Sequence, residues 1–313
     1  MLSLTIQSNT YLNQSNFVAF DPAFFDFLGP NVHTSHVWQP DYTWIHEASC
    51  FVPSLNALFF TSWGFLHDYQ YLLDASTHEL RNVTTSPPIV GAHGCVHYNG
   101  SLYVATDGGD GHYASIYKVN PETWEAEVVI NNFYQQPFMG FNDLDIDPNG
   151  NIWVTDSTSA WTNKSNSLTT FAPPTSPAVY FINTTSLTPK LVFALDGGWT
   201  CNLNGIAVAP DNTLYVDVTS INSGRPKSTD PLRSRALYAF DALDGRPLLR
   251  NQRLFANPVS RFWDGVRVAG NGYVFAASSD GVDVIEPIGG TVLGRIRTPG
   301  GGRKGIWGGE CGV

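Results

Sequence analysis

Five copies of one short pattern run along this chain, and they constrain its fold more than any other feature. Each copy is a turn rich in Gly, Pro, Asn or Asp, followed by a strand-like run with an aromatic residue at its centre. The central aromatics are Phe59, Tyr103, Trp153, Tyr215 and Phe275, which lie 44, 50, 62 and 60 residues apart. Repeats of this length that encode short strands are typical of β-propellers.

Two further strand-like runs follow each copy of the pattern. After the copy centred on Tyr103, for example, they are residues 115–119 and 126–130. Four short antiparallel strands joined by turns make one propeller blade. We therefore expect an all-β fold, a six-bladed β-propeller formed by residues 1–313 as a single domain. Five blades are explicit, and the N- and C-terminal segments are expected to complete the sixth and close the ring. A β-sandwich or a β-helix is the alternative, but neither explains the aromatic-and-turn repeat.

The composition excludes several classes of protein. A hydrophobic content of 42% allows a large core and excludes a disordered chain. The formal net charge of −10 repels phosphate, so we expect no nucleic acid partner. No apolar run reaches the length of about 18 residues that a membrane-spanning helix needs. We therefore expect no membrane partner.

The cysteines and the first residues say little about the compartment. Cys50, Cys95, Cys201 and Cys311 are spaced too widely for a dense disulfide scaffold or for structural zinc, and their pairing stays open. The first residues lack the basic and apolar regions of a secretory signal. A signal that had been removed would leave no trace, so a secreted origin stays open.

Polar residues recur at one offset before the repeat aromatic. Asn142, Asn204 and Asp264 each stand eleven residues before it. The turn of the first repeat is one residue longer than in these three, and Glu47 stands twelve residues before Phe59. The turn of the second repeat is one residue shorter, and His93 stands ten residues before Tyr103. The innermost strands of a propeller surround its axis, so side chains at equivalent positions converge there. We expect these five residues to meet at the mouth of the axial channel.

Four of the five are hard oxygen donors. Carboxylate and amide oxygens are the ligands that Ca²⁺ or Mg²⁺ prefers, whereas zinc prefers nitrogen and sulfur. We predict a metal site of Glu47, Asn142, Asn204 and Asp264 that holds Ca²⁺, with Mg²⁺ or another divalent cation as the alternative. The pairs Asn-Asp, Asn-Gly and Asp-Gly are also common turn formers. Turn usage does not explain why four oxygen donors stand in register before the repeat aromatic.

Longer segments then resemble a known family. The segments Phe141–Asp156 (FNDLDIDPNGNIWVTD), Leu203–Asp211 (LNGIAVAPD) and Trp263–Val266 (WDGV) are similar to the gluconolactonase, senescence-marker-protein and luciferin-regenerating-enzyme family. Phe17–Pro22 (FVAFDP) and His46–Ala48 (HEA) resemble its fungal-type lactonohydrolase branch. The similarity extends from about residue 17 to residue 300.

The resemblance implies a six-bladed propeller with a divalent cation, usually Ca²⁺, held by Glu47, Asn142, Asn204 and Asp264. It also implies hydrolysis of lactones or organophosphates, with Asp264 as base or nucleophile. His93 stands where relatives more often have Asn. It is either a second catalytic residue or a hydrogen-bonded residue of the channel.

The C-terminal residues depart from the family pattern. The family adds another strand pair after about residue 300, and this chain does not, so the sixth blade is expected to be incomplete. An incomplete blade exposes a strand edge. Either the N-terminal segment or a second copy, in a homodimer, is expected to cover that edge.

Aromatic residues lie close in sequence to the predicted ligands, and such side chains suit an apolar or aromatic small-molecule substrate. The predicted substrate-binding residues are Trp63, Phe138, Phe141, Trp161, Trp199 and Trp263. Packing between blades is the alternative role for several of them.

Three functions are compatible with this pattern. The first is a metal-dependent hydrolase that opens a hydrophobic lactone or ester, with Asp264 and His93 as catalytic residues. The second is a biosynthetic cyclase of the hetero-Diels–Alder or isomerase type in secondary metabolism, which would use the same pocket to orient an intermediate. The third is a non-enzymatic interaction propeller. Retention of all four ligand positions favours the hydrolase.

Overall fold

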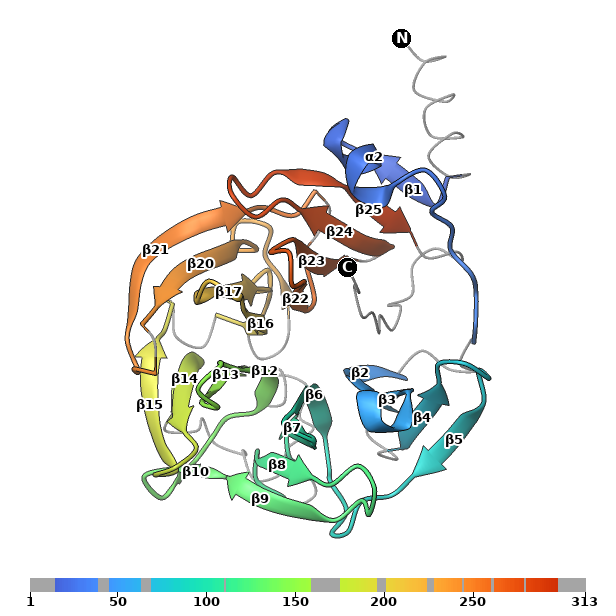
Figure 1. Cartoon of the computed structure of the whole chain (residues 1–313). Helices are drawn as coiled ribbons and strands as arrows, with labels where there is room; N and C mark the ends of the chain where they lie inside the picture. Colours follow the sequence, from blue (N-terminus) through green and yellow to red (C-terminus); the bar gives the residue numbers. More distant parts are fainter. Residues whose placement is uncertain are drawn as a thin grey trace.

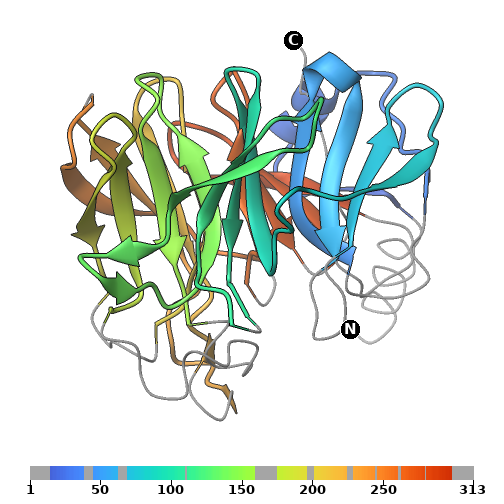
Figure 2. The same ribbon diagram turned by 90° about the horizontal axis from the view of Figure 1, so that it is seen from below.

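A computed structural model of the chain describes residues 15–38, 45–62, 69–109, 111–158, 175–195, 201–223, 228–243, 245–259, 262–278 and 280–297. Within them, five sheets stand around one axis (Figure 1). In the side view the strands run roughly along that axis (Figure 2). The predicted all-β propeller is therefore confirmed. The six-residue α2 (Ala23–Leu28) is the one α-helix of the described part of the chain.

Each sheet is built from strands that follow one another along the chain. The first sheet contains β2 (Ile45–Val52), β3 (Ala57–Ser62), β4 (Gln70–Asp74) and β5 (Leu80–Val83), with a 3-10 turn (Pro53–Leu55) after β2. The second contains β6 (Ala92–Tyr98), β7 (Ser101–Thr106), β8 (Ile116–Val119) and β9 (Ala126–Ile130). The third contains β12 (Phe141–Ile146), β13 (Ile152–Asp156), β14 (Ala178–Asn183) and β15 (Thr188–Phe193).

The fourth sheet has four strands, and the fifth has one more. The fourth contains β16 (Leu203–Val208), β17 (Thr213–Val218), β20 (Leu237–Ala242) and β21 (Leu249–Ala256). The fifth contains β22 (Val266–Val268), β23 (Val274–Ser278), β24 (Gly281–Ile285), β25 (Val292–Arg297) and β1 (Phe17–Ala19). Two short hairpins pair β10 (Asn132–Phe133) with β11 (Gln136–Pro137), and β18 (Asn222–Ser223) with β19 (Ser228–Thr229).

The aromatic-and-turn repeat encodes the second strand of every sheet. Phe59, Tyr103, Trp153, Tyr215 and Phe275 lie in β3, β7, β13, β17 and β23. The strand before each of them, β2, β6, β12, β16 or β22, is the innermost one. Each innermost strand packs against that of the next sheet, from β2 on β6 to β16 on β22.

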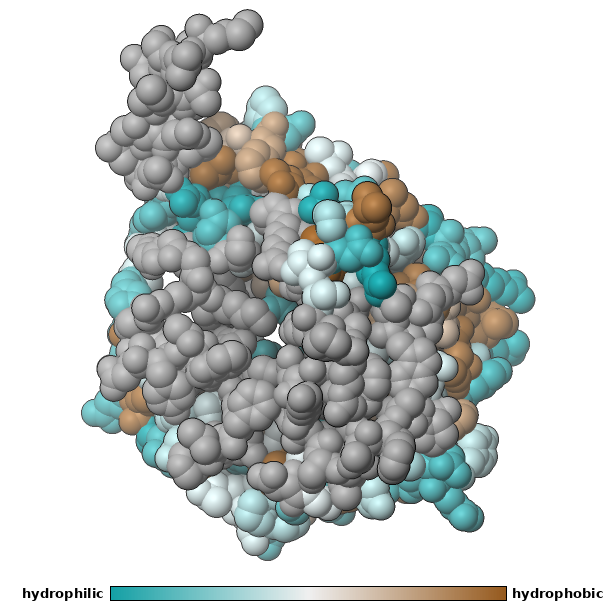
Figure 3. Space-filling view, turned by 180° about the vertical axis from the view of Figure 1, so that it is seen from behind, coloured by the Kyte–Doolittle hydropathy of each residue, from teal (hydrophilic) through white to brown (hydrophobic). Residues whose placement is uncertain are grey.

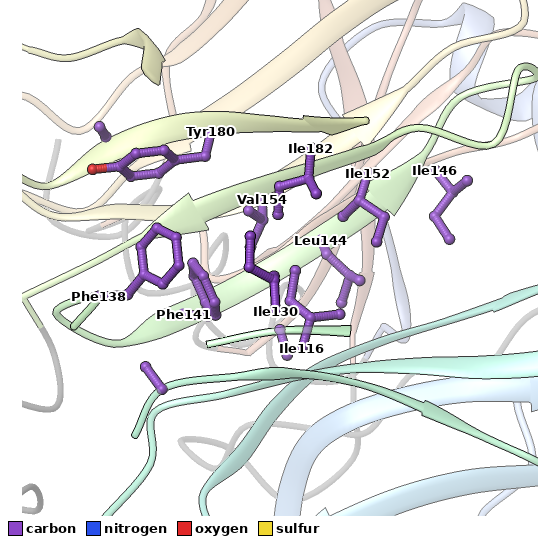
Figure 4. Packing of buried hydrophobic residues seen from close by; sticks show 13 residues of the cluster. Ile116, Ile130, Phe138, Phe141, Leu144, Ile146, Ile152, Val154, Tyr180 and Ile182 are labelled. Atoms are coloured by element: carbon purple, nitrogen blue, oxygen red, sulfur yellow. The ribbon is translucent and has the colours of Figure 1, made fainter. Parts of the chain in front are cut away.

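The hydrophobic core is divided among the spaces between neighbouring sheets. The largest cluster joins the second and third sheets and contains Ile116, Leu144 and Tyr180 (Figure 4). Separate clusters fill the spaces between the first and second, third and fourth, and fourth and fifth sheets. Because the second, third and fourth sheets each bury both faces against neighbouring sheets, packing sets the relative positions of the innermost strands.

The arc of sheets has two ends, which are the first and fifth sheets. Among the described residues, β22 and β2 do not pack against each other as the other innermost strands do. The predicted count of six blades is not confirmed, because the described strands form five.

The N-terminal segment covers the outer edge of the fifth sheet. β1 pairs antiparallel with β25, with Phe17 opposite Ile296. Phe24 of α2 is completely buried and packs with Val284 and Leu293. The other side of α2 is exposed, and apolar atoms gather at this corner of the molecule (Figure 3). Of the two predicted covers for the edge of β25, the structure has the N-terminal segment, and the homodimer stays a prediction.

One disulfide crosses between sheets. Cys50 of β2 is bonded to Cys95 of β6, with 5.7 Å between their Cα atoms. Cys201 is buried, and its thiol donates to the carbonyl of Leu195 at 3.8 Å. Cys311 lies outside the described residues. No helix in the described part of the chain is long and apolar enough to cross a membrane.

Candidate active site

The axis of the sheets contains a cavity of about 450 Å³. All five residues that stand ten to twelve positions before a repeat aromatic line it, namely Glu47, His93, Asn142, Asn204 and Asp264. They come from β2, β6, β12, β16 and the residues just before β22. Residues from or next to all five sheets therefore line one cavity, and their metal-binding and catalytic roles stay predictions.

Irregularities in the innermost strands present these side chains to the axis. The pairing register shifts between Ala92 and Gly94, Phe141 and Leu144, and Leu203 and Ile206, which are the positions that flank His93, Asn142 and Asn204. The register of β2 also shifts on both sides of Glu47. A β-bulge releases a residue from the regular ladder and re-aims its side chain.

Asp264 reaches the axis by a different route. It precedes β22, and its backbone N–H donates to the carbonyl of Ala277 at 2.8 Å. Gly265 follows with φ +103°, a conformation that favours glycine. Asp264 and Gly265 therefore exchange backbone hydrogen bonds with Ala277 of β23, and Asp264 presents its carboxylate to the cavity.

The site residues contact one another in two groups. Asn204 Nδ2 donates to Asp264 Oδ1 at 2.8 Å. His93 Nε2 lies 3.4 Å from Glu47 Oε1, and His93 Nδ1 lies 3.9 Å from Asp107 Oδ1. The His93 side chain is 7% exposed and that of Asp107 is 1% exposed. His93 is therefore held between two carboxyl groups, of which Asp107 was not predicted.

A buried carboxyl also lies near Asp264. Asp217 of β17 is completely buried. Burial, followed by the nearby Asp264 carboxylate, raises the pKa of Asp217 well above its ordinary range. The nearby backbone N–H groups of Gly265 and Val218 partly lower the pKa of Asp217 again. Neither N–H group is placed for a hydrogen bond of ordinary geometry to the Asp217 carboxyl oxygens.

The chemistry of the predicted donor set fits a hard divalent cation. Two carboxylates and two side-chain amides from four different repeats line one cavity. The described residues contain no cluster of three or more His, Cys, Asp or Glu side chains arranged for a metal ion. The predicted set has only two such residues, Glu47 and Asp264, and its other two donors are amides.

The apolar wall of the cavity comes from residues that were not predicted. Ala277, Val282 and Ile296 are opposite one another on β23, β24 and β25, so they form one row across the fifth sheet. This row lines the cavity together with Val268 and Phe275. The sequence gives only a weak signal for this apolar row, because the row can be found only when the register of three strands is known.

The predicted aromatic contacts lie elsewhere. Phe138 and Phe141 belong to the buried cluster between the second and third sheets (Figure 4), and the Trp263 Nε1 group donates to Asp283 Oδ2 at 2.7 Å inside the core. None of the three is among the described residues that line the cavity. Phe141 and Trp263 directly precede a predicted ligand, and consecutive residues of an extended segment point in opposite directions, so these two aromatic side chains face away from the axis. Trp63, Trp161 and Trp199 lie outside the described residues.

Most of the chain matches one family of known proteins. A family model described as the SMP-30/gluconolactonase/LRE-like region matches residues 50–305. The lactonohydrolase oryL of Aspergillus oryzae is 30% identical over 295 residues, which is 87% of this chain and 64% of that protein. The chain thus spans less than two thirds of the length of this relative.

Solved structures share the fold. A gluconolactonase from Xanthomonas campestris has a TM-score of 0.71 at 21% identity, with 91% of this chain and 86% of that chain covered. Regucalcin from Agrobacterium tumefaciens, described as a calcium-binding protein, has a TM-score of 0.58 at 16% identity, with 83% and 76% covered.

Proposed function

We propose, from the premise that this chain belongs to the SMP-30/gluconolactonase/LRE-like family, that it is a lactone hydrolase whose reaction takes place in the axial cavity. The observation that carries the proposal is the convergence of Glu47, His93, Asn142, Asn204 and Asp264 on one cavity. These side chains supply a base, a proton carrier and polar anchors within one space.

The hydrolysis needs two proton transfers. Asp264 takes a proton from the water that attacks the lactone carbonyl, and the 2.8 Å hydrogen bond from Asn204 orients this carboxylate. His93 gives a proton to the ring oxygen when its bond to the carbonyl carbon breaks. Its neighbours Glu47 and Asp107, at 3.4 and 3.9 Å, hold the imidazole on two sides. The product is a hydroxy acid.

The activity is proposed to depend on Ca²⁺ or another divalent cation. Glu47, Asn142, Asn204 and Asp264 would hold it, since their oxygens are the donors that such ions prefer. When bound, the ion would supply Lewis-acid polarisation of the lactone carbonyl.

The proposed substrate is a lactone with an apolar substituent. The row Ala277, Val282 and Ile296, with Val268 and Phe275, faces the same cavity as the polar residues. An apolar wall beside a polar cluster binds a ligand with the same division. No observation favours the cyclase or the interaction propeller, and the relatives named above are a lactonohydrolase and a gluconolactonase.

The test is ring opening of a panel of aliphatic and aromatic lactones, followed with a pH indicator in calcium and in a calcium chelator. We expect turnover that the chelator abolishes and that is faster for apolar lactones. The Glu47→Gln and Asp264→Asn variants are expected to lower kcat/KM by at least about 100-fold, because they remove charge from the reacting centre. Matched controls are Glu79→Gln, at an exposed position between β4 and β5, and Asp211→Asn, at an exposed position between β16 and β17. A folded, calcium-loaded protein that opens no lactone would contradict the proposed function.

A further inference from the structure

Arg267 of β22 joins innermost strands from four of the five sheets. Its Nη1 and Nη2 groups donate to Asp143 Oδ2 and Oδ1 at 2.7 and 3.0 Å, a bidentate pair with β12. Nη1 also donates to the carbonyl of Ile206 on β16 at 3.4 Å, and Nη2 to the carbonyl of Cys95 on β6 at 3.3 Å. Arg267 and Asp143 both line the cavity.

The fifth innermost strand is tied to the same cluster covalently. Cys95, whose carbonyl accepts from Arg267, is bonded through its sulfur to Cys50 of β2. The chain of contacts therefore runs from the fifth sheet across the axis to the second sheet and on to the first. It links the two ends of the arc, whose innermost strands β22 and β2 do not pack against each other as the other neighbours do.

The same contacts reach the residues beside the proposed ligands. Asp143 follows Asn142, and its backbone N–H donates to Thr155 Oγ1 at 3.1 Å. The Thr155 hydroxyl lies 2.6 Å from the carbonyl of Asn204 and donates to it. Arg267 is itself three residues after Asp264. A change in the Arg267–Asp143 pair would therefore shift Asn142, Asn204 and Asp264 relative to one another.

We propose that Arg267 and Asp143 form an axial clamp that sets the spacing between the proposed ligands at the two ends of the arc, and that Arg267 is a positioning residue of the active site. The part of this inference that concerns the ligands rests on the proposed function. The guanidinium group does not serve as a substrate anchor, because its Nη groups donate to Asp143 and to backbone carbonyls.

The chain offers a matched control for the clamp. Arg253 Nη1 donates to Asp241 Oδ1 at 2.7 Å, the same distance as in the axial pair. The Arg253 side chain is 44% exposed and that of Arg267 is 45% exposed. Arg253 and Asp241 lie on β21 and β20, the two outer strands of the fourth sheet. Substitution of Arg253 therefore shows the effect of losing an arginine and an ion pair while the Arg267–Asp143 pair stays intact.

The first measurement is calcium affinity by isothermal titration calorimetry of the whole chain. Arg267→Met and Asp143→Asn are each expected to weaken calcium binding by at least tenfold. Arg267→Lys, which keeps the charge but loses the bidentate fork, is expected to fall between Arg267→Met and the wild type. The double variant is expected to bind no more weakly than the worse single variant, because both changes break one clamp. Arg253→Met is expected to bind as the wild type does.

The second measurement does not depend on the proposed function. Spin labels report the distance between the ends of the arc by double electron–electron resonance. They are placed at Glu79→Cys, between β4 and β5 of the first sheet, and at Ile288→Cys, between β24 and β25 of the fifth, in a Cys311→Ser background. We expect a narrow distribution in the wild type and in Arg253→Met, and a broader or shifted one in Arg267→Met and Asp143→Asn. An unchanged distribution in the folded Arg267→Met and Asp143→Asn variants would overturn the clamp. A wild type that binds no calcium and opens no lactone would overturn the proposed function, and the distance distributions would then decide the clamp alone.

Discussion

At the scale of single residues, three aspartates on the inner and second strands bind protons more tightly than aspartates in water. Burial raises the pKa of Asp145 to about 6 and that of Asp156 to about 7. Burial also raises the pKa of Asp217 well above its ordinary range. Asp156 has the best-defined surroundings, because its oxygens accept from the N–H groups of Gly140 at 2.8 Å and Met139 at 3.1 Å. It therefore anchors the turn that leads into β12 and Asn142.

Asp156 makes the stability of the folded chain depend on pH. Its pKa is about 7 in the folded chain against 3.8 for an ordinary aspartate. Between these two pH values the folded state holds more protons than the unfolded state, so stability falls as the pH rises from about 4 to about 7. The slope from one such group is at most about 1.4 kcal/mol per pH unit. The measurement is urea denaturation at several pH values and one calcium concentration.

Asp156→Asn is the control for that pH dependence, because asparagine does not titrate. The variant is expected to be less stable at every pH, since its Nδ2 group would face a backbone N–H. What decides the prediction is the difference in unfolding free energy between the wild type and the variant, which should shrink as the pH rises. A difference that stays constant from pH 4 to pH 7 would contradict the assignment of the shifted pKa to Asp156.

The residues that line the cavity could be selected from the sequence, because their positions can be counted back from the aromatic residue of each repeat. Asn142, Asn204 and Asp264 share one offset, and a propeller brings equal offsets to one axis. Phe141 and Trp263 were misplaced by adjacency, because neighbours along an extended segment face opposite ways. Asp107 was missed because its approach to His93 depends on the pairing of the residue after β7 with the residue before β6, where the N–H of Asp107 donates to the carbonyl of Gly91 at 2.8 Å.

At the scale of elements, glycine allows the innermost strands to approach each other closely. A Cβ atom added at Gly94 of β6 would lie 2.7 Å from the Cα of Asp143 and 2.8 Å from the carbonyl oxygen of Asn142. A Cβ at Gly205 of β16 would lie 2.6 Å from the backbone nitrogen of Val266. Both glycines follow a site residue directly. The close approach of the strands and the convergence of the site residues therefore have the same local cause.

Substitution of Gly94 tests this close approach. Gly94→Ala is expected to cost about 1–3 kcal/mol in unfolding free energy, because the added methyl group meets backbone atoms that cannot rotate away. Lactone turnover is expected to fall as well, since the methyl group pushes β6 away from Asn142. Gly270→Ala is the control, because nothing lies within 4 Å of its Cβ, and a change within about 0.5 kcal/mol is expected there. Equal urea midpoints for the two variants would show that β6 and β12 are not in tight contact.

The second strands were predictable from their aromatic centres, but contacts between distant elements were not. Arg267 and Asp143 are 124 positions apart, and no periodicity relates them. The cavity row of Ala277, Val282 and Ile296 appears only when β23, β24 and β25 are paired in register. Such contacts depend on the tertiary arrangement, which a repeat predicts in outline and not in side-chain detail.

At the scale of the whole molecule, the repeat predicted the fold class correctly, but it did not predict how the two ends of the arc are held. The five copies of the pattern correspond to the five sheets, and the expected sixth blade had no copy of its own. The N-terminal segment was expected to help close the ring, and its β1 extends the fifth sheet outward on β25. How the two ends of the arc are held is thus a property of particular contacts, namely the axial clamp and the Cys50–Cys95 bond.

The disulfide is expected to stabilise the whole arc because it joins two sheets that come from separate repeats. Cys50 and Cys95 are 45 positions apart, and closing a loop of that length in the unfolded chain corresponds to about 4 kcal/mol in the chain-entropy model. The Cys50→Ala/Cys95→Ala variant should therefore unfold at lower urea concentration, and reductant should lower the midpoint of the wild type but not that of the variant. Cys201→Ala, which removes a buried thiol that forms no disulfide, is the control and should keep its response to reductant. If reductant left the wild-type midpoint unchanged, the bond would not contribute to holding β2 against β6, and the clamp could not act on the first sheet through it.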